Sequence, residues 1–387
     1  MQFEKLETRQ LLAAAPLFKV ASLTSDTPDV PAVHNDPNIE NAWGLSSGPG
    51  TEWWVANNGT GKATLYNGDG VPDSLVITIP PAIGNGTGLP TGQVFNGTTG
   101  FSNAQFIFST EDGSISAWTG AGTAVIKVNN SASGAVYKGL AMGTFNGNNF
   151  LYATNFHTGR VEVYDSNFHL AHLNGSFRDA KIPAGYAPFG IQQISGHIFV
   201  TYALQDATKT GDVSGEGHGI IDVFNPDGSL LHRLVKGGSL NSPWGMARIP
   251  GGFLKFKHDV AVGNFGDGRI QVFDPDTGEA RGFLRKSSNG HIIGIAGLWG
   301  LGFGNDGLAG SSHDLFFTAG PNDESAGLFG KLVISGSTAP QSTTGGGGGG
   351  GYVYPQSASV KVASAGSTSD HKNCDDSAVQ EDVGNVV

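Results

Sequence analysis

Short apolar runs, separated by polar residues and glycine-containing turns, recur along most of this chain. In residues 159–165 the apolar Val161 and Val163 alternate with the polar Glu162, and residues 268–274 repeat the pattern. Side chains on a β-strand point alternately to its two faces, so such a run predicts a strand with one apolar face. Other runs are almost wholly apolar and rich in the aromatic and β-branched residues that strands favour. These runs cover residues 53–57, 106–110, 150–155, 198–202, 260–264 and 315–319.

A phrase built around a single glycine stands before each of these apolar runs. Successive glycines lie about 50 residues apart, the repeat length of a propeller blade made of short strands. The six are Gly44, Gly92, Gly139, Gly190, Gly245 and Gly300. A third run follows each apolar run, and a weaker fourth run closes most repeats. We therefore predict an all-β chain folded as a six-bladed β-propeller over residues 17–336, with the glycine phrase starting the inner strand of each blade.

The last repeat is one strand short. It offers strands near 300–303, 314–319 and 328–334 before the chain reaches a run of glycines. A missing edge strand would leave unpaired backbone groups in the ring. The apolar segment 17–23 precedes the first repeat and has no partner there. We predict that it supplies the fourth strand of the last blade and so closes the ring.

The two ends of the chain differ in composition from the repeats. Residues 337–351 are rich in Gly, Ser and Thr and predict a flexible linker. Residues 352–387 end polar and acidic, which predicts a disordered tail, with a short interaction tail as the alternative. Residues 1–16 make a poor standard signal peptide, because Glu4 and Glu7 dilute the basic region and the apolar stretch is short.

Overall composition narrows the range of partners. The net charge is −11 and no Lys/Arg cluster occurs, which argues against a nucleic-acid partner. The single cysteine, Cys374, lies in the tail, so neither an intrachain disulfide nor a thiolate site in the core is expected. No run of 18 apolar residues is present, so we expect no membrane-spanning segment. We expect a monomer.

Two resemblances add to this picture. Residues 243–247, 259–264 and 268–274 are similar to an NHL repeat, and the N-terminal Leu6-Glu7-Thr8-Arg9-Gln10-Leu11-Leu12 resembles an export motif of large planctomycete proteins. The alternative for the N-terminus is a frayed segment without a targeting role. The repeats as a whole resemble a bacterial family of uncharacterised exported propellers, through residues 41–45, 56–61, 186–189, 240–245, 263–268 and 297–301. The resemblance implies an extracellular or cell-envelope location and carries no established activity. Such proteins often bear C-terminal sorting anchors, and this tail lacks an apolar anchor helix.

One face of the predicted ring should carry the longer loops, because second-to-third and blade-to-blade connections lie on the same face. The longest second-to-third loop is 205–219, in blade four. It contains the ionisable residues Asp206, Asp212, Glu216 and His218. Carboxylates beside glycines can bind Ca²⁺ through hard oxygens, although the spacing does not match an EF-hand. The alternative is a solvated insertion.

A second candidate site lies at the mouth of the central channel. The second strands of three blades end at equivalent residues, Asn57, Asn155 and Asn264. Six-bladed lactonase-type enzymes bind Ca²⁺ or Zn²⁺ at such a mouth through Asn, Asp and Glu, and the metal would polarise a carbonyl. Asp267, Glu111 or Glu324 would have to add the negative charge that three amides lack. The alternative is that each Asn forms a turn at the end of its strand.

These observations leave two functions open, and they do not decide whether the protein is an enzyme. The first is an exported scaffold that binds a ligand or a cell-envelope partner through its long-loop face. The second is a metal-dependent, lactonase-like hydrolase or lyase at the channel mouth. The sequence contains no HExxH and no phosphate-binding loop, and we recognise no catalytic set that supports the second.

Overall fold

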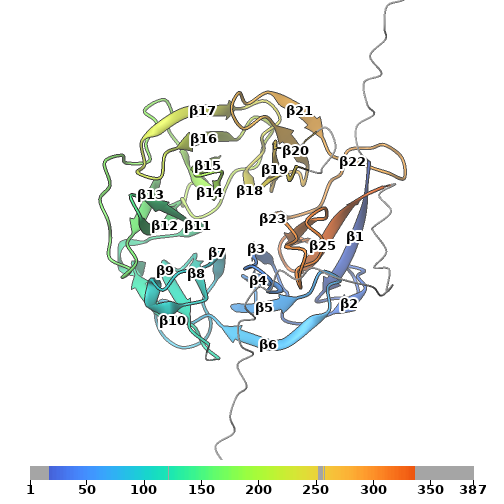
Figure 1. The fold of residues 1–387 in the computed structure, drawn as a ribbon, viewed down its shortest axis with the longest axis horizontal. Helices are drawn as coiled ribbons and strands as arrows, with labels where there is room; N and C mark the ends of the chain where they lie inside the picture. The colour runs from blue at the N-terminus through green and yellow to red at the C-terminus, as the bar shows by residue number, and fades with distance from the viewer. Residues whose placement is uncertain (1–16, 121, 252–255, 257, 336–387) are drawn as a thin grey trace, which may run out of the picture. The chain divides into compact units, whose positions relative to one another are not determined.

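Six antiparallel sheets arranged around a central axis make up the described part of the protein (Figure 1). The computed structural model describes residues 17–120, 122–251, 256 and 258–335. The predictions made for residues 1–16, for the linker 337–351 and for the tail 352–387 lie outside these residues. The prediction of an all-β, six-bladed propeller is confirmed. No helix in the described ranges is long and apolar enough to cross a membrane.

Strands of the same rank occupy the same position in every blade. The inner strands are β3 (Ala42–Ser46), β7 (Pro90–Phe95), β11 (Tyr137–Phe145), β14 (Tyr186–Ile194), β18 (Pro243–Arg248) and β23 (Leu298–Phe303). The second strands are β4 (Trp53–Asn57), β8 (Phe106–Thr110), β12 (Asn148–Asn155), β15 (His197–Leu204), β19 (Val260–Asn264) and β24 (Leu315–Ala319). The third strands are β5 (Lys62–Tyr66), β9 (Ser114–Trp118), β13 (Arg160–Tyr164), β16 (Ile220–Phe224), β20 (Ile270–Phe273) and β25 (Leu328–Ile334). The fourth strands are β6 (Pro72–Thr78), β10 (Val125–Asn129), β17 (Leu230–Lys236), β21 (Ala280–Phe283) and, in blade six, β1 (Leu17–Ser25).

The N-terminal strand completes the last blade, as predicted. β1 runs antiparallel to β25, with a register from Phe18 opposite Ile334 to Ser25 opposite Leu328. The side chains of Phe18 and Leu23 are buried in the clusters on either side. Two short strands, β2 (His34–Asn35) and β22 (Arg285–Lys286), pair with β1 in parallel. The start and the end of the propeller are therefore joined in one sheet.

The repeated glycine lies at a bulge in the inner strand of five blades and directly beside one in blade three. In blade four, the register between β14 and β15 shifts between Pro188 and Ile191, so Gly190 has no strand partner opposite it. Its N–H donates instead to Thr201 Oγ1 (2.8 Å), and that hydroxyl donates to the carbonyl of Pro243 in blade five (2.5 Å). Thr154 and Thr318 make the same pair of bonds in blades three and six. The glycine phrase thus belongs to a hydrogen-bonded connection between neighbouring blades.

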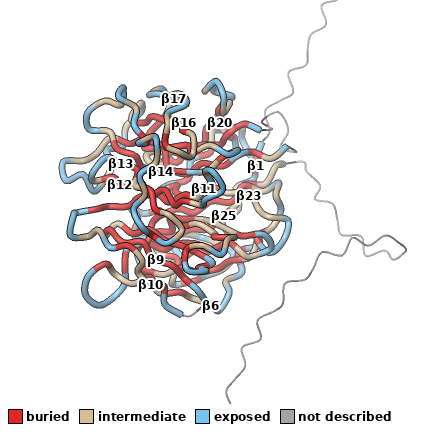
Figure 2. The backbone as a smooth tube through the Cα atoms, turned by 60° about the vertical axis from the view of Figure 1, so that its left-hand side comes forward, coloured by how far each residue is buried: buried red, intermediate tan, exposed pale blue. Residues whose placement is uncertain are grey.

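Large aromatic side chains fill the spaces between blades. Trp53 and Trp54 are adjacent on β4 and point to opposite neighbours. Trp54 stacks on Phe106 of blade two with ring centroids 3.9 Å apart, and Trp53 lies 5.3 Å from Phe316 of blade six. Figure 2 shows the resulting pattern, in which buried residues follow the strands and exposed residues collect in the connections.

The loop lengths agree only in part with the expected difference between the two faces. The second-to-third connection of blade four, 205–219, is long, but first-to-second connections 96–105 and 304–314 are long as well. The second of these is fastened to blade one, because Asn305 Nδ2 donates to the carbonyls of Gly48 and Thr51 (both 2.9 Å). The expectation that one face carries the longer loops is therefore wrong for these blades.

Candidate functional site

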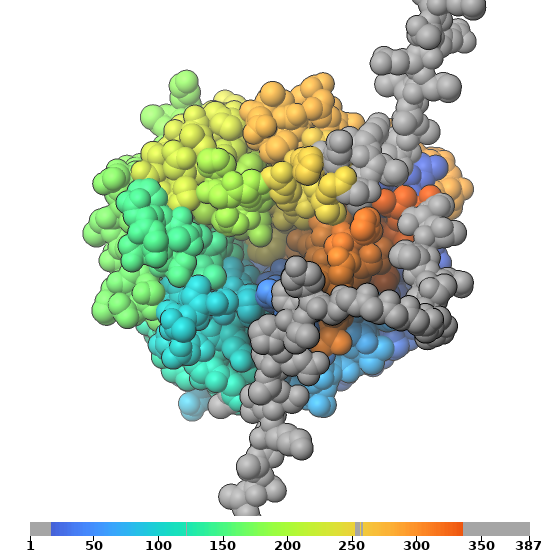
Figure 3. Space-filling view, viewed as in Figure 1, coloured from blue at the N-terminus to red at the C-terminus, as the bar shows by residue number. Residues whose placement is uncertain are grey.

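The central channel is narrow at the level of the repeated glycines. The cavity there has a volume of about 30 Å³ and is lined by residues that include Gly44, Gly92, Gly139, Gly245 and Gly300. One water molecule in the liquid occupies about the same volume, so no organic ligand fits at this level. A binding site on the axis must therefore lie at one of the two mouths, and the face seen in Figure 3 is hollowed at the centre of the ring.

An aromatic floor closes the mouth on the face that carries the second-to-third and blade-to-blade connections, which we call the mouth face. Trp43 and Trp299 stack with their ring centroids 3.7 Å apart, and Phe265 stacks on Trp299 at 4.0 Å. Trp244 meets Trp299 edge to face at 5.7 Å. Trp43, Trp244 and Trp299 belong to three glycine phrases, so the repeat itself builds this floor.

Asn41 joins the floor to a carboxylate above it. Its Oδ1 accepts hydrogen bonds from the indole N–H groups of Trp43 (2.9 Å) and Trp299 (3.3 Å). Its Nδ2 donates to Glu324 Oε2 (2.7 Å). The backbone of Asn41 is left-handed (φ 45°), a conformation that Asn tolerates better than most residues. A Cβ on Gly320 would lie 2.2 Å from Asn41 Oδ1, so only glycine fits beside it.

A buried ion pair stands next to this carboxylate. Lys138 is 4% exposed, and its Nζ is paired with Glu111 Oε1. Asn58 Nδ2 donates to the other oxygen of Glu111 (2.9 Å). The ammonium also lies 5.0 Å from the centre of the Trp43 ring, within the range of a cation–π interaction. One fixed positive charge is therefore built into the mouth.

Negative charge exceeds this single positive charge. Burial raises the pKa of the Glu324 carboxyl, the hydrogen bond from Asn41 lowers it, and the charge of Glu111 raises it further. Lys138 lowers the same pKa and Asp212 raises it, and the net shift is upward. The Glu324 carboxyl is thus held in an environment that favours a proton or another cation.

Beside Glu324 lies a cavity of about 520 Å³. Its lining consists of Ser214, Phe265, Gly266, Asp267, Gly268, Ala296, Gly297, Gly320, Asn322, Asp323 and Glu324. Three of these residues carry carboxylates, and none of them is basic. Asn322, Asp323 and Glu324 have consecutive left-handed backbones (φ 56°, 53° and 65°), an uncommon conformation for residues other than glycine. Such strain is concentrated at functional sites more often than elsewhere.

The three equivalent asparagines use their amides within or next to their own blades. Asn57 Nδ2 donates to Thr64 Oγ1 (2.9 Å), and Asn155 Nδ2 donates to Glu162 Oε1 (2.8 Å). Asn264 Nδ2 donates to the Ser239 carbonyl (2.8 Å). No hydrogen bond in the described structure joins any two of the three asparagines. Their role as metal ligands stays a prediction.

The residues of the blade-four loop are also spread out. Asp206 accepts from Thr208 within the loop, Glu216 is exposed, and His218 Nδ1 lies 2.9 Å from the Val213 carbonyl oxygen. Asp212 is linked to the mouth through its charge, which acts on Glu324. Within the described residues, no group of three or more His, Cys, Asp or Glu side chains is arranged to hold a metal ion.

Sequence reasoning named Glu111, Glu324 and Asp267 but missed Asn41, Lys138 and Asp323. One signal for Lys138 was present. It directly precedes the repeated Gly139, at a position where four of the other phrases have Trp or Phe. A lysine at a position that is aromatic in most repeats is not explained by packing of the fold, so it indicates a local function.

The raised pKa of Glu324 predicts a pH effect on stability. Because the carboxyl is protonated more readily in the folded state, stability should fall as pH rises from the ordinary Glu pKa of about 4.3 through the raised value. Glu324→Gln should remove this fall, so its advantage over the wild type grows from pH 4 to pH 8 in urea unfolding. Glu216→Gln, at an exposed position, is the control. Identical pH profiles for Glu324→Gln and wild type would contradict the assignment.

Comparison with solved structures supports the architecture. The chain is similar to a glucose dehydrogenase (TM-score 0.50, 13% identity, covering 82% of this chain and 100% of the other). It is equally similar to a PQQ-bound aldose sugar dehydrogenase from Streptomyces coelicolor (TM-score 0.50, 12% identity, covering 83% and 100%). Identities this low show the fold alone.

Sequence relatives identify the family. No protein-family model matches the chain. Two proteins of Acanthamoeba polyphaga mimivirus match it over most of their length. Uncharacterized protein R648 is 28% identical over 346 residues, covering 82% of this chain and 81% of that protein. Uncharacterized protein L690 is 31% identical over 345 residues, covering 83% and 87%. The chain therefore belongs to the same family as this uncharacterized mimivirus protein.

Proposed function

We propose that this propeller binds a small organic cation, or a cationic group of a partner, in the cavity at its mouth face. The observation that carries the proposal is the lining of that cavity, which contains the carboxylates of Asp267, Asp323 and Glu324 and no basic residue. Arg269 lies outside the lining, with its Nε 3.9 Å from Asp267 Oδ2. Carboxylates that share a cavity repel one another and lose hydration, and a bound cation relieves both costs. A volume of about 520 Å³ lies within the usual range for small-molecule sites.

The aromatic ring and the carboxylates that line the site favour a flat cation with N–H donors. Phe265 lies at one wall, and its ring is held in place by stacking on Trp299. An aromatic face attracts a cation, and a carboxylate accepts two parallel hydrogen bonds from an amidinium or guanidinium group. Lys138 and Glu111 neutralise each other nearby, and Arg269 lies 3.9 Å from Asp267, so the uncompensated negative charge lies on Asp323 and Glu324.

Benzamidinium and its neutral analogue benzamide make a matched pair of probes. In calorimetric titrations we expect benzamidinium to bind with a Kd between about 10 μM and 1 mM, and benzamide to bind at least about tenfold more weakly. Asp323→Asn and Glu324→Gln should each weaken benzamidinium binding by about tenfold, because each removes one charged acceptor. Asp276→Asn changes an exposed residue of a third-to-fourth turn, on the opposite face, and should have no effect.

Equal affinity for benzamidinium and benzamide would contradict the proposal. So would a loss of benzamidinium affinity in the Asp276→Asn control as large as the loss in Asp323→Asn and Glu324→Gln. A parallel titration with Ca²⁺ addresses the metal-dependent alternative. Stoichiometric Ca²⁺ binding without benzamidinium binding would contradict the proposal and would show that the ligand of this face is a metal ion.

The resemblance of the N-terminus to an export motif supports a proposal for the location of this activity. We place the protein outside the cell or in the cell envelope, where the ligand or partner would be met. Cell fractionation checks this placement, and recovery of the protein in the cytoplasm would contradict it.

A further inference from the structure

Blade three, not blade six, lacks a complete fourth strand among the described residues. Its sheet has the order β11-β12-β13, whereas the other five sheets contain at least four strands. The chain begins a fourth strand after β13, with one bridge between Tyr164 and Leu170 and a bond from Ala171 N–H to the Val163 carbonyl (2.8 Å). After Ala171 it turns toward blade four, where Phe177 N–H bonds to the Gly228 carbonyl (2.9 Å).

Blade five shows what is missing. Residues 159–165 and 268–274 have the same pattern, so Val161 corresponds to Ile270. In blade five the Ile270 carbonyl accepts the N–H of Leu284 (3.0 Å), just beyond β21. In a strand, alternate residues present their backbone groups to the same edge, so Val161 faces the same edge as Val163. No described residue pairs with Val161 at that edge.

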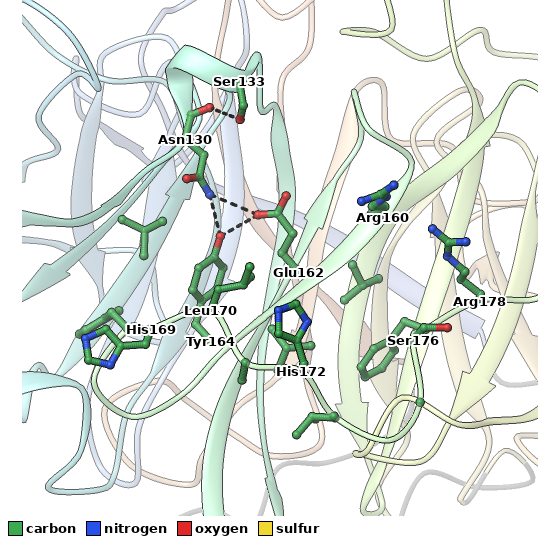
Figure 4. Close-up of a pocket in the computed structure, with 18 of the residues that line it drawn as sticks. Asn130, Ser133, Arg160, Glu162, Tyr164, His169, Leu170, His172, Ser176 and Arg178 are labelled. Atoms are coloured by element: carbon green, nitrogen blue, oxygen red, sulfur yellow. Dashed lines mark hydrogen bonds between the residues drawn. The ribbon is translucent and has the colours of Figure 1, made fainter.

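The space beside this edge is a cavity of about 760 Å³ (Figure 4). β13 forms one wall, residues 168–178 form another, and Lys127 and Val128 of β10 lie at the blade-two side. The cavity is therefore bounded by an open strand edge and sized for several residues of an added chain. An extended peptide can complete such a sheet through backbone hydrogen bonds.

Among the charged side chains around the cavity, the basic ones outnumber the acidic one. Arg160 and Arg178 are exposed, and neither is paired with a carboxylate in the described structure. Lys127, His169 and His172 also line it. Glu162 is the acidic residue in the lining, and its two oxygens accept hydrogen bonds from Tyr137 and Tyr164 (both 2.6 Å) and from Asn155 (2.8 Å). The charge available to a ligand is therefore positive.

We infer that blade three binds an extended acidic peptide, which adds to the edge of β13 as the missing part of its fourth strand. The backbone of the peptide pairs with Val161, and its carboxylates meet Arg160 and Arg178. This site lies at the outer edge of the ring and is separate from the mouth cavity.

The test uses a fluorescent heptapeptide in which Glu and Val alternate, with both ends capped. In anisotropy titrations with the full chain we expect a Kd of about 100 μM or less. The same peptide with N-methylated central amides should bind at least about tenfold more weakly, because it cannot complete the ladder. A version with Lys in place of Glu should bind at least about tenfold more weakly as well.

Protein variants test the charges. Arg160→Ala and Arg178→Ala should each weaken binding about fivefold, whereas Arg269→Ala, at the matched position of blade five, should not. Equal binding of the methylated and unmethylated peptides, or no binding at about 1 mM, overturns the inference even if a variant folds poorly. Displacement by inorganic phosphate without any effect of methylation also overturns it, since it would show a site for small anions. Benzamidinium should not compete, which separates this test from that of the mouth cavity.

Discussion

Deletion of residues 17–25 should abolish the cooperative folding of the whole propeller. The deletion removes β1, exposes the edge of β25 along its length and leaves vacant the space that Phe18 and Leu23 fill. Each buried side chain of this size contributes about 1.5–3 kcal/mol, and the lost strand pairing adds to that. The total is on the order of 5–10 kcal/mol, comparable to the whole stability of a typical domain. Circular dichroism and urea unfolding measure the effect.

Two point substitutions separate the role of β1 from a general effect of truncation. Phe18→Ala removes a fully buried ring and should cost about 3–5 kcal/mol. Leu17→Ala, at a neighbouring side chain that is 37% exposed, should cost well under half of that. A melting temperature unchanged by the deletion would show that the ring closes without its N-terminal strand.

Gly245→Ala should destabilise the ring by about 3 kcal/mol or more. A Cβ at this position would lie 2.2 Å from the carbonyl oxygen of Trp299, which belongs to the inner strand of the next blade. Backbone atoms cannot give way as a flexible side chain can, so the two blades must separate. Denaturant unfolding measures the loss. Gly122→Ala is the matched control, because a Cβ there would meet nothing within 4 Å and the backbone φ is not left-handed.

An unchanged stability of Gly245→Ala would mean that the inner strands tolerate a wider spacing than the structure shows. The same contact recurs around the axis: a Cβ on Gly190 would lie 2.2 Å from the Trp244 carbonyl, and one on Gly44 would lie 2.4 Å from the Thr91 carbonyl. The glycine of the repeated phrase is therefore a requirement of ring closure. It does not itself present any chemistry.

The architecture could be predicted from the sequence because each blade repeats the same local signals. The alternation in residues 268–274 and the glycine phrase at Gly245 each predict one strand. Because the glycine phrase recurs in six repeats, the assignment does not depend on any one of them. The role of β1 in closing the ring could be predicted by counting strands, because segment 17–23 had no partner and the last repeat was one strand short. Nothing in a single repeat could show that Thr201 connects two blades, because its partners Gly190 and Pro243 lie on different strands.

The mouth site could be predicted only in part. Glu111 and Glu324 lie in different blades, and the sequence contains no information on their distance from Lys138. The asparagines at strand ends were the visible repeat, yet Asn155 and Asn264 use their amides to hold nearby residues in place. The repeat supplies the aromatic floor of the mouth through Trp43, Trp244 and Trp299, whereas the buried positive charge comes from Lys138, which departs from the repeat.

Crystallography with a bromine-labelled cation tests the central claim most directly, namely that the mouth cavity binds a cation. The protein would be soaked with para-bromobenzamidinium and measured at the bromine edge. We predict anomalous density beside Phe265, with the amidinium within hydrogen-bonding distance of the carboxylates of Asp323 or Glu324. Density only elsewhere on the molecule, or equal density at the mouth with neutral para-bromobenzamide, would contradict the account.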